Sequence, residues 1–232
     1  MFAIPAALTW RIEAEAWPYI ISSAALELVY FVLLAAVYSR ADYSFAYPIA
    51  RGSAPVIVLL ISVIALDVSI GVGAALGVLA VTAGVLLVRG VGSAAPDTLS
   101  LLLALAVGTC IAGYTLVDDH GIRHAAAIPY FEVVLVMSAI PYALAVGLTR
   151  GSAALRAASN WRAPAAGAGM VAAYLLVLAA LERAEAAPVA ALRETSVVMA
   201  AAGAAIAGRE KVPARRIAGA VLVVAGVAAI AF

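Results

Sequence analysis

Long apolar runs separated by short polar stretches fill the chain from residue 18 onward. The runs are continuous and rich in alanine and leucine, without the alternation of lipid-facing β-strands, so they predict helices rather than a barrel. Each run has about the twenty residues that cross a bilayer. The pattern predicts about eight membrane-spanning helices, at residues 18–38, 43–66, 69–88, 98–117, 126–148, 164–182, 187–208 and 213–231.

The segments between these runs predict how the helices are connected. Residues 1–17 are too mixed to span, and they read as an interfacial lead-in anchored by Trp10 and Trp17. Residues 39–42, a turn at Asp67-Val68 and residues 183–186 are very short links. Short links make sequential helices antiparallel neighbours.

Composition supports an all-α polytopic membrane protein over a soluble one. Hydrophobic residues make up 66% of the chain and charged residues 12%, about half the usage of soluble domains. A net charge of +1 gives no basic footprint for nucleic acid. The single Cys110 excludes an intrachain disulfide and a cysteine-based metal cluster. No phosphate loop or nucleophile with its base is visible, so we expect neither an enzyme nor a cofactor or metal.

An internal repeat organises the predicted helices. A shift of 142 residues superposes six positions, namely Arg51 on Arg193, Ser53 on Thr195, Val56 on Val198, Gly77 on Gly219, Gly84 on Gly226 and Val85 on Val227. The repeat is five helices long, and an odd number of helices inverts the second copy, as in many secondary transporters.

The repeat predicts three regions. They are a lead-in or remnant of a missing helix at 1–17, a first, partial repeat of three helices at 18–89 and a second repeat of five helices at 97–232. We therefore expect this inverted 5+5 arrangement to lack its first two helices. Either the start at Met1 is late or the protein is a shortened form.

Two adjacent charges interrupt the apolar helix predicted at 187–208. The cost of a charge in hydrocarbon makes Arg193 and Glu194 candidates for a functional site. A guanidinium offers a forked set of donors, so Arg193 could hold a carboxylate while Glu194 contacts an amine or carries a proton. The alternative is a buried ion pair with another helix that fixes packing.

Arg51 is the repeat mate of Arg193, in a helix that we expect Pro48 and Pro55 to break early. Irregular backbone in transporters is tolerated where it lines a cavity. Tyr47 and Tyr43 share a face beside Arg51. Alternatively, the tyrosines anchor the helix at the interface and Arg51 snorkels to it.

Glu27 and Glu132 are the other carboxylates within predicted spans, and both are candidate proton carriers. With Glu194 they outnumber the two intramembrane arginines by one acid; the alternative is neutralisation by those arginines. Asp118, Asp119 and His120 follow a predicted span. They could be metal ligands, but the preferred interpretation is a solvated turn.

Three stretches resemble the drug/metabolite transporter superfamily, in its EamA-like family. They are ADYSFAYPIARGSAP at 41–55, GYTLVDDHGIR at 113–123, and AALRETS at 190–196 with the acidic residue that trails its helix at 210. The resemblance implies ten helices in two inverted repeats, transport of small metabolites and a cytoplasmic C-terminus. Loop charges favour the opposite orientation, with both termini outside the cytoplasm.

Together these observations predict an integral, multi-pass transporter in a cell membrane, the bacterial inner membrane. It exports a small polar or amphipathic solute, with possible proton coupling, and its partners are that solute, the bilayer and a possible second copy, but no nucleic acid. The predicted solute-binding residues are Arg51, Tyr47, Tyr114, Tyr174, Arg193, Glu194 and Ser196. The alternatives are a lipid-linked carrier flippase or, if the start is genuine, a non-transporting scaffold or partner subunit.

Overall fold

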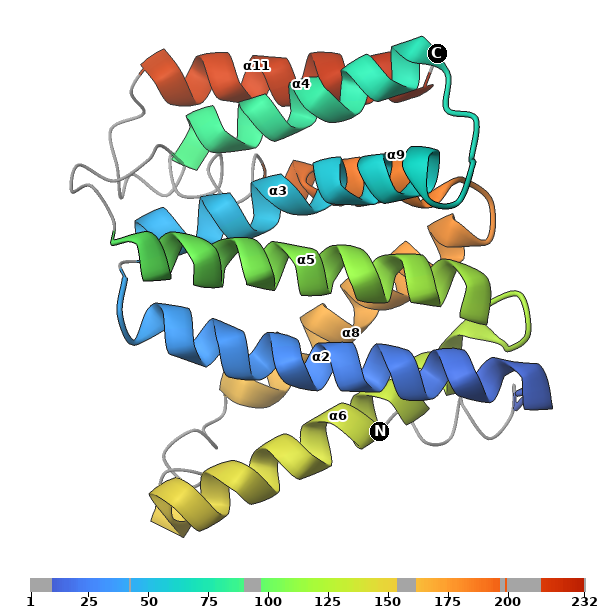
Figure 1. The fold of residues 1–232 in the computed structure, drawn as a ribbon, viewed down its shortest axis with the longest axis vertical. Coiled ribbons are helices and arrows are strands. Elements are labelled where there is room, and N and C mark those ends of the chain that lie inside the picture. The colour runs from blue at the N-terminus through green and yellow to red at the C-terminus, as the bar shows by residue number, and fades with distance from the viewer. Residues whose placement is uncertain are drawn as a thin grey trace. The chain divides into compact units, whose positions relative to one another are not determined.

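The structure is a computed structural model that describes residues 10–41, 43–89, 97–153, 162–196, 199 and 214–231. Within these residues the chain is helical, with one isolated β-bridge and no strand (Figure 1). The elements are η1 (Ala14–Ala16), α2 (Trp17–Tyr38), α3 (Tyr43–Ile64), α4 (Val72–Arg89), α5 (Thr98–Gly121), α6 (Ala127–Arg150), α8 (Arg162–Leu181), α9 (Ala186–Arg193) and α11 (Ala214–Ala231).

The helices have the composition of membrane spans. Four segments of the described chain are long and apolar enough to cross a bilayer by themselves, namely Ala14–Tyr38, Thr98–Gly121, Ala127–Arg150 and Pro164–Leu181. Ile49–Ile64, Val72–Leu87 and Ile217–Ile230 are apolar but shorter. Large apolar side chains such as Leu148 and Ile64 are 87% and 77% exposed, as expected where lipid replaces water. The predicted all-α polytopic membrane fold is confirmed.

Two predicted boundaries are wrong. The helix predicted to end at 117 continues in α5 to Gly121, because the aspartates near its end are buried rather than solvated. The turn predicted at Asp67-Val68 is a longer link between Ile64 and Val72. Asp67 lies there in the left-handed region, with φ of 52°, which ends the α-helical course of α3.

Two predictions about helix continuity are also wrong. α3 runs from Tyr43 to Ile64 through both prolines without the expected break. A proline removes one amide from the helix, and helices in membranes can tolerate that loss. The continuous helix predicted at 187–208 instead ends, as α9, at Arg193. Thr195 and Ser196 are helical again after a turn at Glu194, and positions 197, 198 and 200–208 lie outside the described residues.

The chain divides into two compact units. Unit 1 comprises Met1–Val32 and Leu116–Ala184, and unit 2 comprises Leu33–Thr115 and Glu185–Phe232. In unit 1, α6 packs on α8. The lead-in pairs with the segment before α6: the Ala126 amide donates to the Arg11 carbonyl at 2.8 Å, and the Glu13 amide to the His124 carbonyl at 3.0 Å. Residues 11–13 are therefore fixed by backbone pairing within unit 1.

Unit 2 is built from α3, α4, α9, α11 and the first part of α5. Figure 1 shows α4 and α11 side by side, and they pack antiparallel through glycines. A Cβ on Gly77 would lie 2.6 Å from the Gly226 carbonyl oxygen, and one on Gly84 would lie 2.7 Å from the Gly219 oxygen. The 142-residue shift exchanges these two contacts, because it carries Gly77 onto Gly219 and Gly84 onto Gly226. The five-helix repeat itself stays a prediction.

Candidate functional site

A forked ion pair joins α3 to the end of α9 within unit 2. Arg51 Nη2 lies 3.1 Å from Glu194 Oε1, and Arg51 Nε donates to Glu194 Oε2 at 3.4 Å. The Glu194 side chain is 3% exposed and that of Arg51 is 16% exposed. One hydrogen bond and one close charge contact, each to a different oxygen, fix both the position and the orientation of this carboxylate. The two helices therefore share a buried, directional polar contact.

The end of α9 presents Glu194 for this contact. Its backbone, at φ −75° and ψ −8°, lies at the edge of the helical region, and its amide donates to the Ala191 carbonyl at 3.0 Å. This i to i−3 bond tightens the last turn. The Thr195 hydroxyl donates to the Leu192 carbonyl at 2.8 Å and satisfies one of the last carbonyls. The polar step that interrupts the sequence is thus also the place where the helix ends.

Each arginine of the site lies over a tyrosine ring. The Arg51 guanidinium carbon is 5.8 Å from the centre of the Tyr47 ring, and that of Arg193 is 5.9 Å from the centre of the Tyr114 ring. Arg193 Nη2 also donates to the Tyr114 hydroxyl at 3.3 Å. A ring face attracts a cation and shields it from hydrocarbon. The tyrosines therefore help to keep both guanidinium groups inside the protein.

A glycine brings α5, which carries Tyr114, close to α3. A Cβ on Gly108 would lie 2.8 Å from the Ala50 carbonyl oxygen and would overlap the Ser53 hydroxyl. Any larger residue would separate the two helices at this point. Gly108 thus allows three elements of unit 2, namely α3, α5 and α9, to supply the groups of the site.

Five of the seven predicted solute-binding residues come together in this arrangement, namely Arg51, Tyr47, Tyr114, Arg193 and Glu194. Tyr174 belongs to unit 1, where its ring stacks on Phe131 with centroids 4.8 Å apart. Ser196 is exposed. Arg51 contacts Glu194, so the interhelical ion pair that the sequence analysis gave as the alternative is present. A solute-binding role for the site stays a prediction.

The two carboxylates predicted to carry protons lie in unit 1. Glu27 is 8% exposed and accepts a hydrogen bond from the Ser138 hydroxyl at 2.9 Å. Glu132 is half-buried. Their proposed role stays a prediction.

Asp118 is a buried polar residue whose setting the sequence did not predict. The expected solvated turn is wrong here, because the side chains of Asp118 and Asp119 are buried, at 0% and 6% exposure for the whole residues. Asp118 Oδ1 accepts from the Tyr130 hydroxyl at 2.8 Å, and Oδ2 accepts from the Tyr174 hydroxyl. Two tyrosines within predicted spans, Tyr130 and Tyr174, could have indicated this cluster, because a buried tyrosine needs a hydrogen-bond partner for its hydroxyl. Within the described chain, no group of three histidine, cysteine or acidic side chains is arranged to hold a metal ion.

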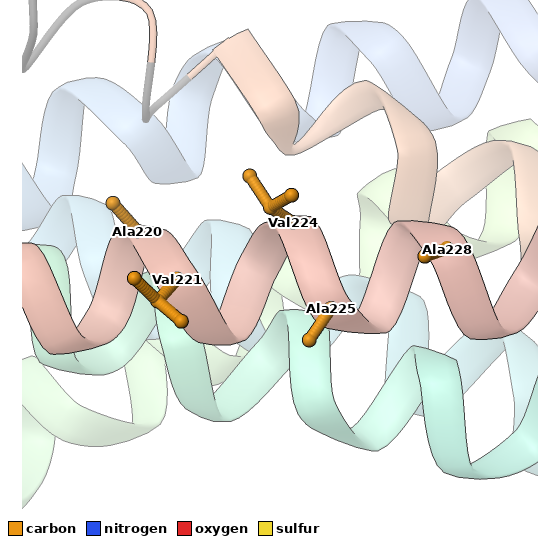
Figure 2. A pocket seen from close by; sticks show the side chains of 5 residues that line it. All are labelled: Ala220, Val221, Val224, Ala225 and Ala228. Atoms are coloured by element: carbon orange, nitrogen blue, oxygen red, sulfur yellow. The ribbon is translucent and has the colours of Figure 1, made fainter.

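A shallow groove follows one face of α11. Figure 2 shows the side chains that line it, all of them small and apolar: Ala220, Val221, Val224, Ala225 and Ala228. It offers a polar solute no side-chain hydrogen bond. We therefore place the candidate site at the Arg51–Glu194 ion pair rather than in this groove.

Known proteins resemble the chain at the level of family and fold. A model of the EamA-like transporter family matches residues 98–232. A solved structure described only as "Crystal structure of protein" matches with a TM-score of 0.74 and 18% identity, over 93% of this chain and 78% of the other. At 18% identity the match supports the fold alone. No curated protein matches the sequence.

Proposed function

This chain belongs to the EamA-like transporter family, whose model matches residues 98–232, and from that premise we propose that it carries a small, carboxylate-bearing solute across the membrane. The family makes it a multi-pass membrane transporter of the drug/metabolite type. Net export and residence in a bacterial inner membrane are part of the same proposal.

The observation that carries the proposal is the arrangement of Arg193 beside the Arg51–Glu194 pair. Two guanidinium groups and one carboxylate give these three residues a formal charge of +1. Arg193 is half-buried and donates to a phenol, which is a neutral group. A positive charge held in a low-dielectric environment favours an anionic group of the solute.

Carboxylate recognition also follows from what Glu194 contacts. Arg51 already contacts both of its oxygens, Oε2 through a hydrogen bond and Oε1 at ion-pair distance, so an amine of the solute would have to compete with a guanidinium for them. The Arg193 guanidinium has five N–H donors and stays protonated at every physiological pH, so it can bind a solute carboxylate while it keeps its hydrogen bond to Tyr114. We therefore assign Arg193 to the solute carboxylate, and Arg51 to the orientation of Glu194.

The test is solute entry into proteoliposomes that contain the purified full chain. An isotope-labelled metabolite extract is placed outside, and mass spectrometry identifies the solutes inside. We expect at least one small carboxylate to enter with the wild-type protein and to stay at the empty-vesicle background with Arg193→Ala. Arg183→Ala is the matched control, because Arg183 is an exposed arginine whose side-chain partners are the Ala179 carbonyl and Glu182.

Two results would contradict the proposal. One is a wild-type protein that admits no solute above the empty-vesicle background. The other is equal entry with Arg193→Ala and with the control, at equal protein content in the vesicles.

A further inference from the structure

Unit 1 contains a polar cluster that the solute site does not use. Asp118, in the last turns of α5, contacts Tyr130 of α6 and Tyr174 of α8. Resting on the transport activity proposed above, we propose that Asp118 is the residue that takes up and releases the proton that drives transport.

The geometry lets both protonation states of Asp118 keep their hydrogen bonds. Each carboxylate oxygen meets one phenol, Oδ1 that of Tyr130 and Oδ2 that of Tyr174. A phenol can donate or accept, whereas a guanidinium can only donate. When a proton arrives, the bond to one phenol can reverse its direction, so neither state leaves an orphaned oxygen.

Ser23 provides the acceptor that such a reversal needs. This residue of α2 is fully buried, and its hydroxyl has no hydrogen-bond partner among the described residues. It lies close to Tyr130. When the new proton sits on Oδ1 of Asp118, that O–H donates to the Tyr130 oxygen, and the Tyr130 O–H turns to Ser23 Oγ.

Each proton that Asp118 takes up on one side of the membrane is released on the other side. A hydronium ion on one side of the membrane gives its proton to the Asp118 carboxylate and becomes water. On the other side, the Asp118 carboxyl returns a proton to water. Only O–H bonds form and break, and nothing is oxidised or reduced.

Titratable side chains follow Asp118 along the chain at the end of α5. The neighbouring Asp119 lies 3.8 Å from His120 Nδ1 and 3.2 Å from Arg123 Nη2, measured to its Oδ2. His120 and Arg123 have side-chain exposures of 39% and 62%. A proton can therefore enter from the exposed end of the helix. Among the described residues of the other elements, the titratable and polar groups that face the cluster are Ser23, Tyr130, Tyr174, and Glu27 with its partner Ser138.

Protonation of Asp118 would also change the contacts between helices in unit 1. The carboxylate joins three helices, so a change in which group donates alters the bonds among α5, α6 and α8 at once. A ligand shifts a conformational equilibrium only through different contacts in the two states, and here the proton provides them. Among the contacts described for Glu27 and Glu132, none joins one carboxylate to phenols of two other helices as at Asp118.

Infrared difference spectroscopy tests the proton site without any solute. A pH jump applied to the purified full chain should produce a carboxylic-acid carbonyl band that is absent in Asp118→Asn and present in Glu182→Gln. Glu182 is a matched carboxylate control, since it lies at the surface of the same unit. A band that persists in Asp118→Asn, or that is lost in Glu27→Gln or Glu132→Gln instead, would overturn the assignment.

Tyrosine variants keep the proposal testable if Asp118→Asn does not fold. Tyr130→Phe and Tyr174→Phe each remove one hydrogen bond to the carboxyl group, so each should shift the frequency of the same band. A band unmoved by both variants would contradict the relay.

Solute accumulation then tests the coupling. With the membrane potential clamped, one proton per solute gives about a tenfold concentration ratio per pH unit. We expect this ratio with wild-type and with Glu182→Gln, and a ratio of one with Asp118→Asn, for a solute identified in the extract experiment. A tenfold ratio with Asp118→Asn would overturn the inference. Absence of any wild-type flux would instead overturn the transport proposal, and the infrared result would still decide the proton site.

Discussion

Glu194 in unit 2 and Asp118 in unit 1 are both buried carboxylates, but they are held by opposite kinds of partner. A forked guanidinium contacts Glu194, whereas two phenols contact Asp118. Arginine stays charged at every physiological pH, so it holds Glu194 as an anion. A phenol tolerates either protonation state of its partner. This difference is the basis for our proposal of a fixed charge in unit 2 and an exchangeable proton in unit 1.

The same difference predicts which carboxylate loses more stability when one of its partners is removed. A buried ion pair that loses one member leaves an uncompensated charge, whereas a carboxyl group that loses one hydroxyl can become neutral. The two units should therefore respond differently to comparable substitutions.

The largest effect that we expect is on stability, from Arg51→Met. This change leaves Glu194 buried without its guanidinium, which should lower the free energy of unfolding by about 3 to 5 kcal/mol. Denaturant titration of the purified protein in detergent measures it. Adding Glu194→Gln should recover most of that loss, because it removes the unpaired charge. If Arg51→Met alone is as stable as the wild-type protein, unit 2 does not contain a fixed ion pair.

Glycine substitutions compare packing in the two units, with a smaller effect. Gly84→Ala places a Cβ 2.8 Å from the Val223 amide nitrogen. Because this nitrogen belongs to the backbone, α11 must shift to relieve the close contact. We expect a loss of about 1 to 3 kcal/mol, typical of overpacking. Gly169→Ala on α8 meets no atom within 4 Å, so it should be neutral or stabilise by up to about 1 kcal/mol. Equal unfolding midpoints for the two variants would show that α4 and α11 are not in contact.

The smallest effect should come from Asp97, the N-cap of α5. Hydrogen bonds from Ser100 hold the pKa of this carboxyl below its ordinary 3.8, with a further contribution from Arg40. Such a group stabilises the folded protein above pH 3.8, and the contribution disappears as the pH falls through the lowered pKa. Asp97→Ala should therefore lower the melting temperature slightly at pH 7, and the difference from wild type should shrink below pH 3.8.

Much of the fold could be predicted from the sequence, because apolar runs of about twenty residues have few alternatives in a bilayer. The starts of α3, α5 and α6 lie within one residue of the predicted ones. The ends were harder to predict. α5 continues past residue 117 because partners far along the chain bury Asp118, and hydropathy does not include such contacts.

The candidate site was predictable in composition and less so in pairing. The cost of charge in hydrocarbon identifies Arg51, Arg193 and Glu194 from the sequence alone. Which arginine would pair with Glu194 depended on the turn that ends α9, and local sequence does not determine that turn. The Asp118 cluster was missed because clustered polar residues after a span usually face solvent.

The most direct measurement is the flux of one identified solute at equal pH on both sides of the vesicle, with Arg193→Ala and Asp118→Asn assayed in parallel. If unit 2 binds the solute and unit 1 binds the proton, Arg193→Ala falls to the empty-vesicle background, whereas Asp118→Asn stays above it. Flux through Arg193→Ala that equals the wild-type value, with Asp118→Asn at background, would contradict this division between the two units.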